Sequence, residues 1–156
     1  MCRHRLDRYE EAAAALRLSM DLLTPLHTAE AAAWGRQLAS ATQEAADVER
    51  DLGHWPQALE LSRRALDLWT ELPGERWASH RAFAMRTFAD VRAKAGVELD
   101  EALERVDEAI AGHTALLATQ PGKPYRHEID ESQLVRTKVL EAMIRRRSAS
   151  DGGIEH

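Results

Sequence analysis

An alanine-centred pattern occurs three times along this chain at nearly equal spacing. Aligned on Ala12, Ala58 and Ala102, the copies lie 46 and 44 residues apart. A period of this length is that of a repeat built from two helices and their loops. The pattern therefore predicts a stack of helical hairpins, and no other feature of the sequence restricts the fold as strongly. Each copy also has a second small residue seven positions later, and these residues are Ser19, Ala65 and Ala109.

The composition favours an all-α fold. Aromatic residues make up 5% of the 156 residues, alanine and leucine dominate the apolar positions, and β-branched residues are sparse. Such a mixture favours helices that pack closely through small side chains. With 44% hydrophobic and 30% charged residues, the chain has the composition of one soluble domain. We expect this domain to span residues 1–147.

The charge pattern and the lack of long apolar runs argue against two classes of partner. The net charge is −5 with both signs interleaved, so no broad cationic surface gathers phosphates, and we expect no nucleic-acid binding. No apolar run approaches the roughly 20 residues needed to cross a bilayer, so we expect no membrane partner. The single cysteine, Cys2, can form no internal disulfide. We therefore expect the protein in the reducing cytoplasm.

Proline and glycine divide the chain into six predicted helices and a tail. The residue before a proline is disfavoured in a helix, so we expect the first helix to end before Thr24. Thr28 is the expected N-cap of the second helix, and Gly53 and Gly96 are the expected left-handed stops of the second and fourth helices. Pro56 suits the first turn of the third helix. The predicted helices are 6–23, 28–52, 55–71, 75–95, 99–118 and 127–147, and 148–156 is expected to be a disordered tail.

These helices pair by sequence into two hairpins, 28–71 and 75–118. Ala46 and Ala89 lie seven residues before the glycines at the two turns, where small side chains let the helices of a hairpin approach closely. The first helix is then a half-repeat. The helix at 127–147 has an apolar stripe and a charged outer face, so we expect it to cap the stack.

The middle copy resembles a tetratricopeptide (TPR) repeat. It has a small residue in the first helix, a Gly-x-aromatic turn, alanines seven apart in the second helix and a proline in the exit loop. These residues are Ala46, Gly53, Trp55, Ala58, Ala65 and Pro73. The resemblance covers residues 6–147, and the spacing is similar to that of the long-repeat type found in bacterial regulators. It implies a right-handed superhelical solenoid that acts as a scaffold, while a generic hairpin solenoid or an irregular bundle stays open.

In this family the first helix of each pair lines a concave groove that holds peptides or helices. Arg86 and Arg136 are the candidates for a clamp on a carboxylate, because a guanidinium offers two parallel donors. A row of solvated side chains is the alternative. Carried over to this chain, the resemblance implies a groove lined by Gln43, Asp47, Arg50, Phe83, Arg86, Thr87, Asp90, Lys94, Gln133 and Arg136.

The first predicted helix is apolar around much of its surface, because the run Ala12–Ala15 adds to the leucines that follow it. One neighbouring helix does not cover such a surface, and exposed apolar patches mark partners. We therefore expect a homodimer through this helix, or one more helix upstream of it. Shelter by the long helix 28–52 is the alternative. The predicted interface residues are Ala12, Ala15, Leu16, Met20 and Leu23.

No motif of the sequence indicates catalysis, a metal or a cofactor. None of the seven histidines pairs with another histidine, a cysteine or a carboxylate at the spacing of a known metal motif, and neither a phosphate loop nor a nucleophile motif occurs. We therefore predict a non-enzymatic cytoplasmic adaptor or regulator that binds a peptide or protein segment. A sensor of a signal peptide or small molecule, with a pocket formed by Trp34, Trp77, Phe83 and Arg86, is the second hypothesis. A helical enzyme without a recognisable motif is the third.

Overall fold

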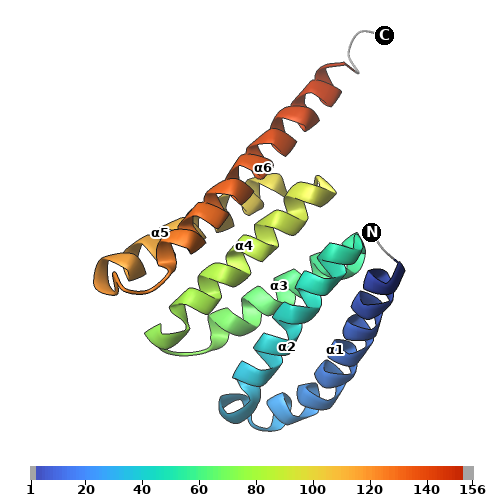
Figure 1. The fold of residues 1–156 in the computed structure, drawn as a ribbon, viewed down its shortest axis with the longest axis vertical. Coiled ribbons are helices and arrows are strands. Elements are labelled where there is room, and N and C mark those ends of the chain that lie inside the picture. The colour runs from blue at the N-terminus through green and yellow to red at the C-terminus, as the bar shows by residue number, and fades with distance from the viewer. Residues whose placement is uncertain (1–2, 153–156) are drawn as a thin grey trace. The chain divides into compact units, whose positions relative to one another are not determined.

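Every element within the described residues, 3–152, of the computed structural model is a helix (Figure 1). The all-α class is therefore confirmed for this range. The predictions for Cys2 and for residues 153–156 of the tail lie outside the described residues. The elements are α1 (Arg3–Ala29), α2 (Ala31–Leu52), α3 (Trp55–Glu71), the short 3-10 helix η1 (Glu75–Trp77), α4 (Ala78–Ala95), α5 (Leu99–Thr119) and α6 (Tyr125–Asp151).

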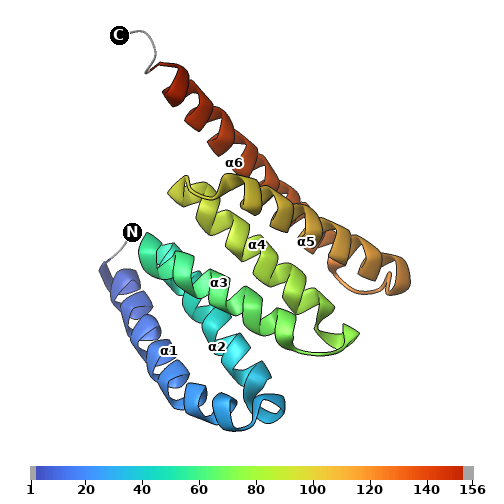
Figure 2. The same ribbon diagram turned by 180° about the vertical axis from the view of Figure 1, so that it is seen from behind.

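The chain is divided into two compact units, Met1–Trp77 and Ala78–His156. In the first unit, α2 packs against both α1 and α3. In the second unit, α5 packs against α4 and α6, and α4 also contacts α6 (Figure 2). The pairs α2–α3 and α4–α5 are those that the sequence repeat places together as hairpins. The single domain over 1–147 and the superhelical solenoid stay predictions.

The turns of both hairpins form where the sequence predicts them. Gly53 ends α2 with a φ of 74°, and Gly96 ends α4 with a φ of 70°. Glycine adopts this left-handed conformation without the steric cost that a Cβ atom would add. Pro56 lies in the first turn of α3, where its missing N–H has no helical partner to lose.

The alanines of the repeat are buried between the helices, as their spacing predicts. Ala46 and Ala58 are fully buried in the first unit. In the second unit, Ala89 and Ala102 are fully buried in a cluster with valines of α5 and α6, among them Val106. Small side chains at these points allow the helix axes to approach closely, and the larger Phe88 and Trp69 are buried as well.

The predicted end of the first helix at Thr24 is wrong, because α1 continues through Pro25 to Ala29. A proline inside a helix removes one backbone hydrogen bond and bends the helix, and α1 is bent near this end (Figure 2). Tertiary contacts hold the segment in place: Arg64 of α3 donates a hydrogen bond to the Thr24 hydroxyl at 3.0 Å. Packing against α2 and this hydrogen bond to α3 stabilise the helix more than Pro25 destabilises it.

The predicted N-cap at Thr28 is also wrong. Thr28 lies inside α1, where its hydroxyl donates to the carbonyl of Thr24 at 3.0 Å. The residue that precedes α2 is Glu30, whose side chain makes no capping hydrogen bond. The start of α2 is therefore set by the turn after α1 and not by a side-chain cap.

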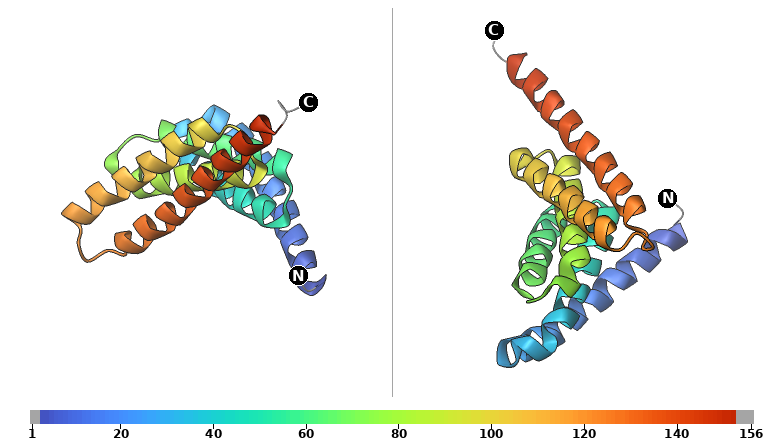
Figure 3. Two further views of the ribbon diagram at one scale, coloured as in Figure 1. Left: turned by 90° about the horizontal axis from the view of Figure 1, so that it is seen from above. Right: turned by 90° about the vertical axis from the view of Figure 1, so that its left-hand side faces the viewer.

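The last helix is longer than predicted at both ends. α6 begins at Tyr125, two residues before the predicted start, and continues to Asp151, so residues 148–151 are helical and not disordered. No glycine or proline interrupts the chain between Tyr125 and Gly152, and without such a residue the helix propagates. Its C-terminal end extends beyond α5 (Figure 3).

Candidate functional site

Three of the predicted groove residues lie together on α2 and interact with one another. Gln43 is buried, and its amide nitrogen lies 3.5 Å from a carboxylate oxygen of Asp47. Arg50 forms ion pairs with Asp47 at 3.3 Å and with Asp51 at 3.2 Å. These ion pairs are local to one helix, and Arg50 is shared between the two carboxylates.

Arg86 of α4 is engaged inside the second unit. Its guanidinium lies 2.7 Å from the carboxylate of Glu128 at the start of α6, and it also donates to the Glu128 carbonyl at 3.2 Å. The guanidinium carbon stacks 4.6 Å from the centroid of the Phe83 ring. Arg86 therefore braces α6 against α4 and already has a carboxylate partner.

Arg136 has a different carboxylate partner from Arg86. Its Nε donates to Asp107 of α5 at 2.7 Å, so the two arginines proposed as one clamp are each bound within the fold to a separate acid. Gln133, one turn earlier on α6, is exposed. The carboxylate clamp stays a prediction, and an external carboxylate would have to replace Glu128 and Asp107.

The remaining groove residues form a polar cluster on α4 and α6. Asp90 is buried and lies 3.3 Å from Lys94 and 3.7 Å from Lys138. Thr87 is buried beside them on α4. Lys138 was not among the predicted groove residues. Only its position on the polar face of the last helix could have indicated it.

The predicted interface on α1 is divided between two faces of the helix. Met20 is buried within the first unit, Ala12, Leu16 and Leu23 are half-buried, and Ala15 is exposed. One exposed row of apolar side chains consists of Ala15 with Leu18, Leu22 and Leu26. The three leucines are 60%, 65% and 42% exposed, and we call this set of four residues the α1 stripe.

The α1 stripe follows from helix geometry. Its members are three or four residues apart, so they lie along one face, while Ala13 and Met20 point to the opposite, buried face. The sequence alone identified an excess of apolar surface on this helix. It could not tell which face α2 would cover, because both faces are rich in alanine and leucine.

A pocket of about 560 Å³ lies entirely within the first unit. It is lined by His27 of α1, by residues of α2 between Ala31 and Gln37, by residues between Leu68 and Pro73, and by Arg76–Trp77. We call it the α2–α3 pocket. Of the four residues that the sequence suggested for a sensor pocket, it includes Trp77 and none of the others.

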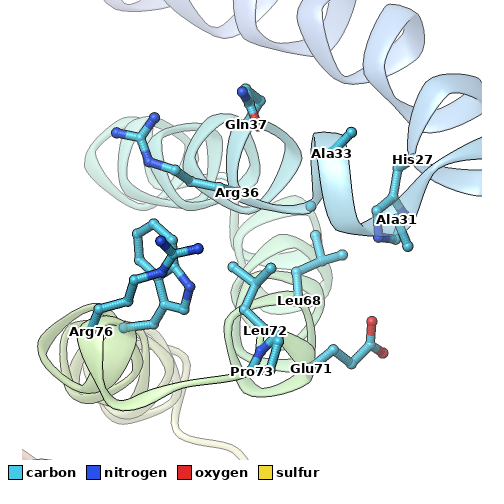
Figure 4. Close-up of a pocket in the computed structure, with 12 residues that line it drawn as sticks. His27, Ala31, Ala33, Arg36, Gln37, Leu68, Glu71, Leu72, Pro73 and Arg76 are labelled. Carbon is cyan, nitrogen blue, oxygen red and sulfur yellow. The ribbon is translucent and has the colours of Figure 1, made fainter.

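The side chains of the α2–α3 pocket are arranged by chemical type (Figure 4). Arg36 and Arg76 lie together at one end, Leu68 and Leu72 lie in the middle, and Glu71 lies towards the other end. Gly35 leaves room for Leu72 here, because a Cβ atom at this position would lie 2.9 Å from a methyl group of Leu72 and the leucine side chain would have to shift. The pocket thus has a cationic end and an apolar middle.

Trp77 forms the wall at the cationic end. The guanidinium carbon of Arg76 lies 4.7 Å from the centroid of its ring, and that of Arg36 lies 5.9 Å away. The ring of the buried Trp69 supports Trp77 from α3 at a centroid distance of 5.8 Å. Cation–π attraction of this kind holds both arginines near one indole.

His113 is the buried titratable group of the second unit whose pKa is shifted. Its Nε2 lies 3.1 Å from the hydroxyl of Ser79, and its ring stacks on Tyr125 at a centroid distance of 5.8 Å. Burial lowers the pKa of His113 below its ordinary 6.5, the carboxylate of Glu128 acts in the opposite direction, and the guanidinium of Arg86 lowers it. The folded state therefore favours the neutral imidazole.

A lowered histidine pKa makes the stability of this unit depend on pH. Below about pH 6.5 the unfolded chain binds a proton that the folded state rejects, so stability is complete above this pH and falls below it. Between about pH 7.5 and about pH 5.5, His113 is expected to contribute a loss of no more than about 1.4 kcal/mol. Urea unfolding followed by circular dichroism measures this loss in the parent protein and in His113→Gln.

The matched control is His127→Gln, because His127 is exposed on α6. The His113 variant should have a shallower dependence on pH than the parent, while the His127 variant should match the parent. Identical pH profiles for the parent and His113→Gln would contradict the assignment.

A comparison of the chain with protein-family models, with curated proteins and with solved structures finds no match. In the described part of the chain, no helix is long and apolar enough to cross a membrane. Over the same residues, no group of three or more histidine, cysteine, aspartate or glutamate side chains is placed to hold a metal ion. The candidate sites are the α1 stripe, the α2–α3 pocket and two groups of polar residues. One group is Gln43, Asp47 and Arg50 on α2, and the other is the polar cluster of α4 and α6.

Proposed function

We propose that this chain is a non-enzymatic protein-interaction module that binds its partner through the α1 stripe. The observation that supports the proposal most is the exposure of Leu18, Leu22 and Leu26 along one face of α1. Burying a leucine side chain gains about 1.5–3 kcal/mol, so three aligned leucines are a substantial driving force for association. The resemblance of the middle repeat to TPR proteins supports the same class of function.

The partner proposed for the stripe is a second copy of the chain. A two-fold contact requires a surface that matches itself. When two α1 helices run antiparallel with the two-fold axis level with Met20, Leu18 of each copy faces Leu22 of the other. The same register places Leu26 opposite Ala14 and next to Ala15, both of which are exposed, so a large side chain meets small ones.

The polar groove predicted on α2, α4 and α6 has weaker support as the main binding surface. Arg86 and Arg136 already form close ion pairs within the fold, and an external carboxylate would have to replace those partners. The groove stays a prediction for a second, weaker contact.

Replacing Leu18 and Leu22 with glutamate is the test of this proposal. We expect the parent protein to sediment as a dimer at about 100 µM, and the double variant to sediment as a monomer with unchanged helical content. The expected rise in the dissociation constant is at least about 100-fold, because two leucines are lost from each copy.

Leu134→Glu is the matched control, since Leu134 is a leucine of similar exposure, 59%, on α6. This variant should dimerise like the parent. A parent protein that sediments as a monomer at the highest concentration would overturn the dimer, as would a double variant that still dimerises.

A second candidate function is a small-molecule or signal-peptide sensor. The α2–α3 pocket favours it, because a volume of about 560 Å³ lies within the usual range of small-molecule sites. Ligand binding at this pocket and self-association through α1 use different residues, so the two functions can be tested separately.

A further inference from the structure

We propose that the α2–α3 pocket binds a small organic anion that carries one carboxylate on an apolar body. The inference rests on the sensor function proposed above, and it is independent of the α1 stripe. Its basis is the side-chain arrangement of the pocket, in which two guanidinium groups, an apolar floor and one carboxylate follow one another (Figure 4).

The cationic end is built to accept an anion. Arg36 comes from α2 and Arg76 from η1, yet the guanidinium groups of both lie near the ring of Trp77. Within residues 3–152, no carboxylate lies at ion-pair distance from either guanidinium. A guanidinium carries its N–H groups along its edge, and that edge matches a carboxylate in bidentate geometry.

The middle of the pocket is apolar and favours a ligand whose body is apolar. Leu68 is buried at its base, and Leu72 and Pro73 continue the apolar surface. On the opposite wall, Ala31 and Ala33 add only methyl groups, so the space between the helices stays open. Gly35 keeps this wall thin, because a Cβ atom there would displace Leu72.

The far end limits the ligand to a single negative charge. Glu71 lines the pocket away from the two arginines (Figure 4). A second anionic group at that end would meet the Glu71 carboxylate and be repelled. The pocket therefore favours a monocarboxylate over a dicarboxylate.

Octanoate, octanamide and octylamine form a probe series with similar chains and different charge. We expect octanoate to bind with a dissociation constant near or below about 1 mM, with octanamide at least about tenfold weaker and octylamine weaker still. All four tryptophans, Trp34, Trp55, Trp69 and Trp77, belong to the first unit, so their fluorescence reports binding there. Calorimetry gives the same constants independently.

Two arginine variants and a control test the cationic end. Arg36→Gln and Arg76→Gln should each weaken octanoate binding by about tenfold and leave octanamide binding unchanged. Both side chains are exposed, so neither substitution removes core packing. Arg126→Gln, at an exposed position on α6, should bind octanoate like the parent. Ala33→Phe should weaken both octanoate and octanamide, because it occupies the apolar middle.

The outcomes separate the ligand class from the sensor function. Equal affinity for octanoate, octanamide and octylamine would overturn the carboxylate assignment, while the pocket would remain a binding site. No saturable signal from any of the three probes at about 10 mM would overturn both the carboxylate assignment and the sensor function. Octanoate binding that is insensitive to both arginine substitutions would overturn the assignment to this pocket.

A free metabolite and a peptide end could both supply such a carboxylate, and one further comparison distinguishes them. Tighter binding of octanoate than of an acetylated alanine peptide ending in leucine indicates a small molecule and supports the proposal. Tighter binding of the peptide, lost when its terminal carboxylate is amidated, overturns the small-molecule form of the proposal.

Discussion

Replacing Phe88 with alanine is expected to lower the free energy of unfolding of the Ala78–His156 unit by about 3–5 kcal/mol. Phe88 is fully buried on α4, so loss of its ring leaves a cavity that the surrounding helices fill only in part. The substitution also uncovers Arg92, whose guanidinium carbon lies 3.3 Å from the ring centroid and which is itself buried. A buried charge would then border an empty space, which adds to the loss.

Urea unfolding followed by circular dichroism measures this effect, and tryptophan fluorescence assigns it. Because every tryptophan lies in the first unit, a transition seen in the helical signal and not in fluorescence belongs to the second unit. Phe83→Ala is the matched control. Phe83 is half-buried on the same helix and stacks on Arg86, so we expect a loss about half as large or less. Equal losses in the two variants would contradict the role given to burial.

Substituting leucine for Ala102 should destabilise the same unit by about 1–3 kcal/mol through overpacking. Ala102 is fully buried in the cluster formed by α4, α5 and α6, in which Ala89, Val106 and Val139 are also fully buried. A leucine adds three carbon atoms at a point where the helices are packed with no exposed surface between them. The helices must separate or the new side chain must leave its preferred rotamer.

The control for this substitution is Ala111→Leu on the same helix. Ala111 is exposed, and leucine forms helices nearly as well as alanine, so we expect a change within about 0.5 kcal/mol. Thermal and urea unfolding of both variants by circular dichroism make the comparison. An Ala102 variant as stable as the parent would mean that the small residues of the repeat do not limit helix approach.

The hairpin elements could be predicted from the sequence because their signals are local. α3 has the predicted bounds, Trp55–Glu71, since Gly53 and Pro56 define its start and Pro73 follows its end. The buried alanines were found by their spacing alone. Residues separated by a fixed number of positions on a helix share a face whatever the rest of the chain does.

The two ends of the chain were less predictable. Pro25 indicates a helix end by local preference, yet the contacts of α1 with α2 and the bond from Arg64 to Thr24 hold the helix together. The bond from Arg64 to Thr24 joins residues 40 positions apart, so no local pattern contains it. The extension of α6 has another reason: the small polar residues after Arg147 predict disorder by composition, yet no glycine or proline interrupts the helix before Gly152.

The candidate sites depended even more on the folded arrangement. Arg86 and Arg136 have the right chemistry for a clamp, but Glu128 and Asp107 become their partners once α4, α5 and α6 pack together. The α2–α3 pocket joins His27 to Trp77, and its only sequence signals were an arginine beside a tryptophan and a glycine within α2.

The sequence by itself determined that this protein is all-α, where its two hairpins turn and which small residues are buried. These properties follow from helical periodicity and from glycine and proline, which act over a few residues. Only the tertiary structure decided which charged groups are neutralised, which face of α1 keeps its leucines exposed, and where a pocket remains. Those outcomes depend on distances between segments far apart in the chain, and such distances exist only after the helices have packed.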